Sequence, residues 1–116
     1  MAIGTFTGRS ILIVEDEPII AFDISQTFED AGATTITAST MEAALRLVEK
    51  DGLSAAVLDF GHDAHALCAR LRERSIPFVL HSGSGHVDDS CCGGVIVPKP
   101  AATFTLVAAV AELLRV

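Results

Sequence analysis

The chain has 116 residues, a length that suits one domain with a sizeable hydrophobic core and no second module. Fifteen acidic residues against eight basic ones give a net charge of −7, which argues against a nucleic-acid partner held by phosphate neutralisation. The apolar runs are too short for a signal peptide or a membrane span. Three cysteines do not make a disulfide framework, so we expect a reduced, cytoplasmic protein that binds neither nucleic acid nor membrane.

In chain order, we expect a loosely packed lead-in over residues 1–9 and one domain over residues 10–116. Short apolar runs bounded by turn residues predict buried strands at 11–15, 54–59, 77–81 and 95–97. Residues 34–38 predict a weaker, Thr-rich strand at the sheet edge. Helical spacing of apolar residues predicts four helices: from Pro18 to about 31, from Ser39 to before Asp51, at about 63–73, and from about 102 to the end. Ser39 and Glu42 have the spacing of a capping box. Strands that alternate with helices predict right-handed crossovers and a three-layer α/β domain.

Charged residues follow three of the predicted strands. Glu15 and Asp16 end the first strand, Asp59 ends the third, and Lys99 follows the last. If the strands are parallel, their carboxyl ends lie along one edge of the sheet, and these four residues converge there. Carboxylates crowded in this way repel, so at least one should titrate at an unusually high pH until a dication compensates them. Three carboxylates and one ammonium predict a site for a divalent metal and a phosphoryl group.

Four short segments carry a resemblance to a known family. They are Ile13-Val14-Glu15-Asp16-Glu17-Pro18, Val57-Leu58-Asp59, Ser82-Gly83 and Pro98-Lys99-Pro100. In this order they resemble the motifs of the CheY-like receiver domain of two-component response regulators, over roughly residues 10–116. The resemblance implies a flavodoxin-like, doubly wound sheet of five parallel strands in the order 2-1-3-4-5.

The same resemblance implies a mechanism and its partners. Asp59 would accept a phosphoryl group from the phosphohistidine of a sensor histidine kinase or a histidine phosphotransfer protein, assisted by Lys99 and Ser82. Mg²⁺ would be bound by Asp16, Asp59 and the carbonyl of Gly61, with Glu15 acting through water. The protein would be a monomeric or weakly dimeric phosphoacceptor rather than an enzyme, and would assist its own phosphorylation and dephosphorylation. If 116 residues is the natural length, it acts on an unknown downstream protein by contact, as a phosphorelay intermediate or as a phosphate sink.

Residues 82–94 depart from the family pattern. This stretch is rich in glycine and has little helical periodicity, and the spacings from Asp59 to Ser82 and from Ser82 to Lys99 are short. We therefore predict a shortened third helix and a reduced or missing fourth helix. Similar departures mark an alphaproteobacterial subgroup with a Phe-Ala-Thr-Gly-Tyr motif, which Pro77-Phe78-Val79 and Gly83 fit and Leu80, His81 and Ser84 do not.

A second departure is Ile96, which stands where the family usually has an aromatic residue that passes on the signal. We expect reorganisation of residues 83–94 to replace the rotation of that ring.

Other functions remain open from the residues alone. A receiver-like binding module that works without phosphorylation is the main alternative, and a metal-dependent hydrolase is a weaker one. A zinc site would draw on His62, His65, His81, His86, Cys68, Cys91 and Cys92. The spacing of these residues is unlike that of structural zinc sites, and solvated loop histidines with small buried cysteines explain them better. On the apolar last helix, Phe104, Ala108 and Ala111 form a second face that either the chain itself or a partner covers.

Overall fold

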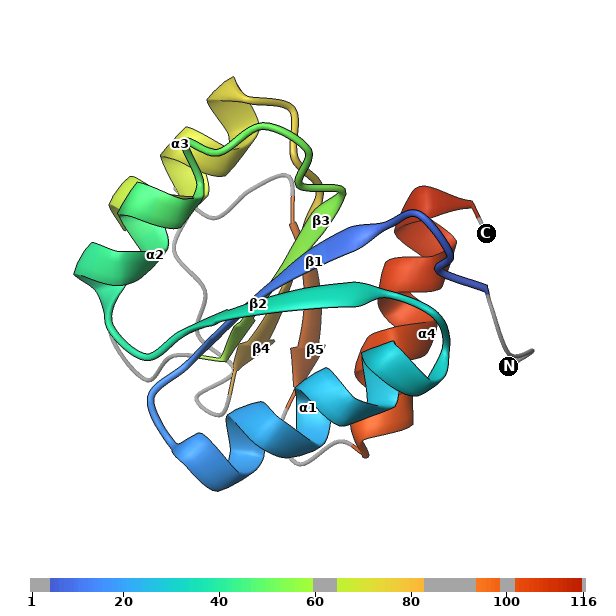
Figure 1. Ribbon diagram of the computed structural model, residues 1–116. Helices are drawn as coiled ribbons and strands as arrows, with labels where there is room; N and C mark the ends of the chain where they lie inside the picture. Colours follow the sequence, from blue (N-terminus) through green and yellow to red (C-terminus); the bar gives the residue numbers. More distant parts are fainter. Residues whose placement is uncertain (1–4, 60–64, 83–93, 99–101, 116) are drawn as a thin grey trace.

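The computed structural model describes residues 5–59, 65–82, 94–98 and 102–115. Within them, five parallel strands form one sheet in the order β2-β1-β3-β4-β5, which confirms the predicted topology (Figure 1). The strands are β1 Ser10–Glu15, β2 Thr34–Ala38, β3 Ala55–Asp59, β4 Phe78–Ser82 and β5 Val95–Pro98. The helices are α1 Pro18–Asp30, α2 Met41–Leu47, α3 His65–Glu73 and α4 Thr103–Leu114. None of the described helices is long and apolar enough to cross a membrane.

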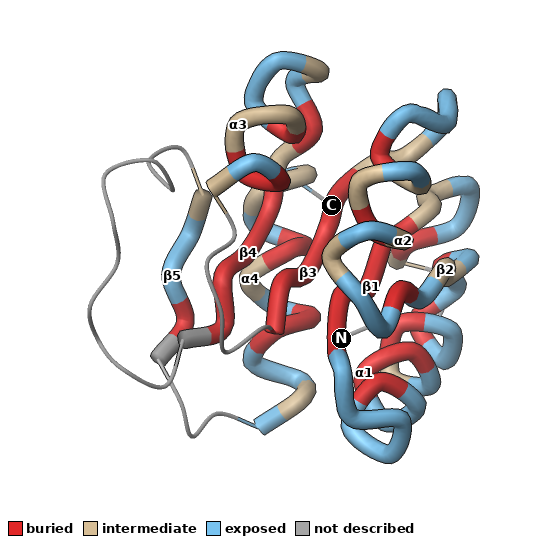
Figure 2. The backbone as a smooth tube through the Cα atoms, turned by 90° about the vertical axis from the view of Figure 1, so that its left-hand side faces the viewer, coloured by how far each residue is buried: buried red, intermediate tan, exposed pale blue. Residues whose placement is uncertain are grey.

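Helices cover both faces of the sheet, as the alternating pattern predicts. Ile11 and Ile13 of β1 join the apolar cluster beneath α1 and α4, whereas Leu12 and Val14 join the cluster beneath α2 and α3 (Figure 1). Burial on both faces explains why the central strands read as continuous apolar runs. Figure 2 shows β1, β3 and β4 as buried strands, whereas part of β5 is exposed at the sheet edge.

The termini of α1 and α2 are set by local residues. Pro18 occupies the first turn of α1, and Gly32, just beyond its end, has a φ of +100° that favours glycine. The predicted cap of α2 is wrong by one residue. Thr40, not Ser39, is the N-cap, and its hydroxyl accepts a hydrogen bond from the amide of Ala43 at 3.1 Å.

Residues 5–9 are not the loose lead-in that the sequence predicts. Phe6 is fully buried, and its ring packs edge-to-face on Phe28 with centroids 5.4 Å apart. Its amide also donates a hydrogen bond to the carbonyl of Ala31 at 2.8 Å. The packed part of the domain therefore begins before Ser10, because a large apolar side chain there fills the cluster beneath α1.

The connections around α3 and β5 are described only in part. The described part of the third helix is His65–Glu73, and its predicted start near residue 63 lies outside the described residues. The predicted loss of the fourth helix falls on residues 83–93, which lie outside the described residues. At Gly94, an added Cβ would lie 2.3 Å from the ring of buried Phe78, so only glycine fits where the chain enters β5.

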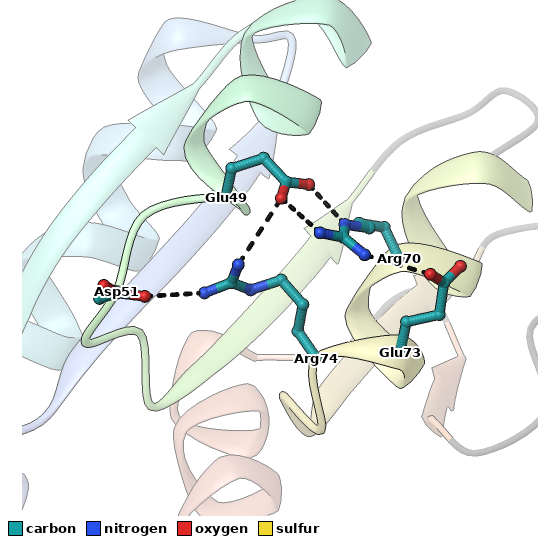
Figure 3. Close-up of polar contacts among 5 residues, drawn as sticks. All are labelled: Glu49, Asp51, Arg70, Glu73 and Arg74. Carbon is teal, nitrogen blue, oxygen red and sulfur yellow. Dashed lines mark hydrogen bonds and ion pairs between the residues drawn. The ribbon is translucent and has the colours of Figure 1, made fainter.

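Ion pairs join the turn after α2 to α3 and the residue that follows α3 (Figure 3). Arg70 binds both carboxylate oxygens of Glu49, through Nε at 2.5 Å and Nη2 at 2.6 Å, and also lies 3.1 Å from Glu73. Arg74 lies 3.1 Å from Asp51 and 3.6 Å from Glu49. These residues precede β3 and β4 in the chain, so the network lies toward the amino ends of the strands.

Candidate functional site

Two carboxylates are buried at the carboxyl ends of neighbouring strands. Glu15 ends β1 and Asp59 ends β3, and the two residues pair in the parallel register. Alternation along each strand places them on the face of Ile13 and Val57, beneath α1 and α4. Glu15 is 3 % exposed and Asp59 is 2 % exposed, which is unusual for acidic side chains. Asp16, the next residue after β1, is exposed beside them.

Burial has a direct electrostatic consequence at Glu15. The pKa of Glu15 rises from 4.5 to about 7, chiefly because burial disfavours the charged carboxylate, while the nearby carboxyls of Asp59 and Asp16 raise it further. A hydrogen bond that the amide of Glu17 donates to Oε1, at 3.0 Å, opposes this rise. The prediction that one carboxylate titrates unusually high is confirmed. Its main cause is desolvation rather than the repulsion on which the prediction was based.

His81 also lies at this edge, although it was not among the predicted site residues. It is 8 % exposed in β4, so the expectation of a solvated loop histidine is wrong. The register pairs Leu58 with Leu80, which brings Asp59 and His81 together at the next position. His81 Nδ1 lies 3.2 Å from Asp59 Oδ2. The signal was present in the sequence, since both residues end adjacent strands in the predicted order.

The remaining predicted site residues are placed only in part. Ser82 is the last residue of β4, the strand next to β3, but its side chain lies outside the described part of the chain. Gly61 and Lys99 also lie outside the described residues. The predicted convergence of Lys99 with the carboxylates therefore stays a prediction.

Among the described residues, no group of three or more His, Cys, Asp and Glu residues could hold a metal ion. The zinc alternative gains no support from the described members of its set: His65 begins α3, Cys68 is buried within that helix, and His81 contacts Asp59. Its other members, His62, His86, Cys91 and Cys92, lie outside the described residues.

The chemistry of the site nevertheless fits Mg²⁺. The donors are carboxylate oxygens, which Mg²⁺ prefers, and it usually takes only one or two of them along with water. Oε2 of Glu15 is buried, and no described residue forms a hydrogen bond with it. A dication beside it would also offset the crowding of like charges that raises the Glu15 pKa.

A groove runs from this site along α1. It lies between α1 and β2, with Glu15 and Pro18 at one end and Glu29 and Thr35 at the other. Glu15 is among the residues that line the groove, and Asp59 is not.

Comparisons with known proteins agree on one kind of domain, although no protein-family model matches the chain. The transcriptional regulatory protein TcrA of Mycobacterium tuberculosis is 32 % identical over 97 residues. That match covers 79 % of this chain but only 38 % of TcrA, so the chain spans well under half of that regulator.

Solved structures match over nearly the whole chain. SdrG from Sphingomonas melonis Fr1 is 32 % identical with a TM-score of 0.71, over 98 % of this chain and 99 % of SdrG. A response regulator receiver protein from Sinorhizobium medicae WSM419 is 26 % identical with a TM-score of 0.77, over 93 % of this chain and 95 % of that protein.

Proposed function

The chain belongs to the receiver-domain family of two-component response regulators, and we propose that it accepts a phosphoryl group on Asp59 from a phosphohistidine. The donor is a sensor histidine kinase or a histidine phosphotransfer protein. The observation that carries this proposal is the burial of Asp59 at the carboxyl end of β3, in register with Glu15. Burial of a carboxylate lowers the stability of the fold. A catalytic or binding role explains why such a residue is present despite this cost.

The proposed reaction needs one nucleophile and charge neutralisation. A carboxylate oxygen of Asp59 attacks phosphorus, the phosphorus–nitrogen bond breaks, and the electron pair leaves with the donor imidazole, which yields an aspartyl phosphate. Asp16, Asp59 and the Gly61 carbonyl, with Glu15 through water, would hold Mg²⁺, which when bound supplies positive charge for the phosphoryl oxygens. Lys99 and the hydroxyl of Ser82 are proposed to bind those oxygens. The position of Ser82 at the end of β4 supports its part.

Exposed apolar residues on α1 support a docking role for this helix. Ile19 and Phe22 are both largely exposed, and α1 begins just after the carboxylates of β1. We propose that the kinase or phosphotransfer partner binds here, beside Asp59. Phe104 on α4 is also exposed and is the proposed contact for the downstream protein or for weak dimerisation.

Read-out of the signal is proposed to differ from the usual family pattern. Ile96 lies on edge strand β5 with 47 % of its surface exposed, where an aromatic ring would be expected. Reorganisation of residues 83–94, almost all outside the described residues, is the proposed substitute. Hydrogen exchange with and without beryllofluoride should show changed protection in that segment, and equal protection in both states would reject this read-out.

Intact-mass analysis after incubation with acetyl phosphate and Mg²⁺ tests the main proposal. We expect one phosphoryl adduct on the wild type, none on Asp59→Asn, and none without Mg²⁺. Asp30→Asn, which changes an exposed carboxylate at the far end of α1, is the matched control and should react like the wild type. No wild-type adduct, even with a phosphorylated histidine phosphotransfer protein as donor, would contradict the proposal.

One alternative function is favoured by specific observations. A receiver-like module that binds proteins without phosphorylation needs no aromatic residue at the position of Ile96. Such a module also does not need Asp59 as a nucleophile, so the contact of His81 with Asp59 would not impair it. This function predicts that Asp59→Asn binds its partner as the wild type does, with or without a phosphoryl donor.

A further inference from the structure

The phosphoryl-transfer chemistry proposed above gives no role to the contact between His81 and Asp59. Both side chains are buried, and Nδ1 of His81 lies 3.2 Å from Oδ2 of Asp59. Asp59 is an acceptor when it is ionised, so the proton in this contact belongs to Nδ1. His81 is then the hydrogen-bond donor to the carboxylate, through Nδ1–H.

Packing alone does not account for a histidine at this position. His81 follows Val79 on the same face of β4, and across the sheet it pairs with buried Val97. An apolar side chain would fill such a place without the desolvation cost of an imidazole. Nε2 of His81 is itself buried, and no described residue forms a hydrogen bond with it. The bond to Asp59 is therefore the one described interaction that offsets burial of this ring.

The two neighbours of Asp59 approach it from opposite sides. β3 lies between β1 and β4, so Glu15 stands on one side of Asp59 and His81 on the other. A donor that fixes Oδ2 from the β4 side fixes the plane of the carboxylate, and with it the direction of Oδ1. In-line attack on phosphorus depends on that direction, and small misplacements cost up to about a hundredfold in rate.

We propose that His81 is a positioning residue for Asp59, whose Nδ1–H holds the carboxylate in the orientation from which it attacks phosphorus. This inference rests on the phosphoacceptor role proposed for Asp59. It adds a residue from β4 that acts on the nucleophile itself rather than on the phosphoryl group.

Substitutions at position 81 separate the hydrogen bond from the volume of the ring. His81→Asn keeps an N–H donor at nearly the place of Nδ1, whereas His81→Leu keeps volume and loses the donor. His81→Gln moves the donor one bond further out and serves as a second donor-displaced variant if the leucine variant unfolds. His65→Leu, on α3, is the matched control for removing a histidine. Thermal unfolding of each variant shows which of them are folded.

The first readout is the rate of adduct formation with acetyl phosphate and Mg²⁺. We expect His81→Leu and His81→Gln to react about tenfold to a hundredfold more slowly than the wild type, the loss expected for a hydrogen bond to a charged group. His81→Asn should recover most of that rate, and His65→Leu should match the wild type. The proposal is overturned if His81→Leu reacts as fast as or faster than the wild type, or if the asparagine variant is as slow as the leucine variant.

The second readout does not depend on phosphorylation. Long-range proton–nitrogen NMR correlations of ¹⁵N-histidine-labelled protein, without metal, report which ring nitrogen of His81 carries the proton. We expect Nδ1–H in the wild type and loss of that preference in Asp59→Ala. An Nε2–H tautomer in the wild type would overturn the proposal. If the tautomer is as expected but the wild type forms no adduct, the contact exists, and both the phosphoacceptor function and the positioning role fail.

Discussion

The two ends of the sheet use charge in opposite ways. At the carboxyl end, Glu15 and Asp59 place charges of the same sign in a buried position. Toward the amino end, Arg70 and Glu49 pair opposite charges at the surface between α3 and the turn after α2 (Figure 3). The pKa of Glu15 is raised, chiefly by burial, and the pKa of Glu49 is lowered, chiefly by its hydrogen bonds from Arg70. The crowded, buried carboxylates thus lie at the end of the sheet where the proposed chemistry needs them.

This contrast explains how each end of the sheet affects the stability of the folded state. An exposed ion pair stabilises modestly, because water screens it and two long side chains lose freedom. A buried, crowded carboxylate destabilises the folded state until a proton or a cation compensates it. Stability should therefore respond to pH, metal and salt differently at the two ends, and the predictions below test that difference.

The largest effect is expected from pH in the metal-free protein. The folded-state pKa of Glu15, about 7, lies above the value of 4.5 for an unperturbed glutamate, so the folded state binds the proton more tightly. The free energy of unfolding should then fall as pH rises from 4.5 through 7, by between about 1 and 3 kcal/mol. Chemical denaturation in EDTA from pH 5 to pH 8 measures this dependence.

Two controls identify the group responsible for that pH dependence. Glu15→Gln should flatten the profile, because glutamine does not titrate. Saturating Mg²⁺ should flatten it in the wild type, because a cation replaces the proton. A wild-type profile that is flat or rising over the same range in EDTA would show that Glu15 is not desolvated as the structure describes.

A smaller effect is expected from removing one of the like charges. Asp59→Asn should raise the metal-free free energy of unfolding by about 1 kcal/mol at pH 8, because it relieves repulsion with ionised Glu15. At pH 5 the gain should shrink, since Glu15 is then mostly protonated. The asparagine carbonyl can still accept the hydrogen bond from His81, so packing is preserved. An Asp59→Asn protein that is no more stable than the wild type at pH 8 would mean that the carboxylates do not interact.

The smallest effect is expected at the opposite end of the sheet. Arg70→Ala should lower stability slightly, by less than the change at Asp59, because it breaks the two bonds to Glu49. High salt should shrink the difference between mutant and wild type. The matched control is Arg46→Ala, which removes a single, more exposed contact to Glu42 at 3.4 Å and should cost less still.

Acid should also remove the stabilisation that the ion pair between Arg70 and Glu49 provides. Because the folded-state pKa of Glu49 is lowered, its pairing contributes fully above pH 4.5 and is lost as pH falls further. Arg70→Ala and the wild type should thus converge in stability at low pH. Thermal unfolding from pH 3 to pH 7 measures this convergence, and a constant difference across the range would show that Arg70 acts through packing of its alkyl chain rather than its charge.

Much of the architecture was predictable because its signals are local. Short apolar runs located the strands, helical spacing of apolar residues located the helices, and parallel order followed from their succession. The pairing of Glu15 with Asp59 followed in turn, since the ends of parallel strands meet at one edge. Thr40 shows the limit of such signals. Ser39 and Thr40 are both good caps, and only the path of the backbone decided between them.

What the sequence by itself determined is thus the order of the elements and the residue types at the edge of the sheet. Only the tertiary structure decided how deeply those residues are buried and which side chains meet. Burial depends on every element packed above a residue, which is why spacing predicted neither the enclosed Phe6 nor desolvation as the main cause of the raised Glu15 pKa. The contact of His81 with Asp59 depends on register between two strands separated by a helix, and register is fixed by packing across the whole sheet.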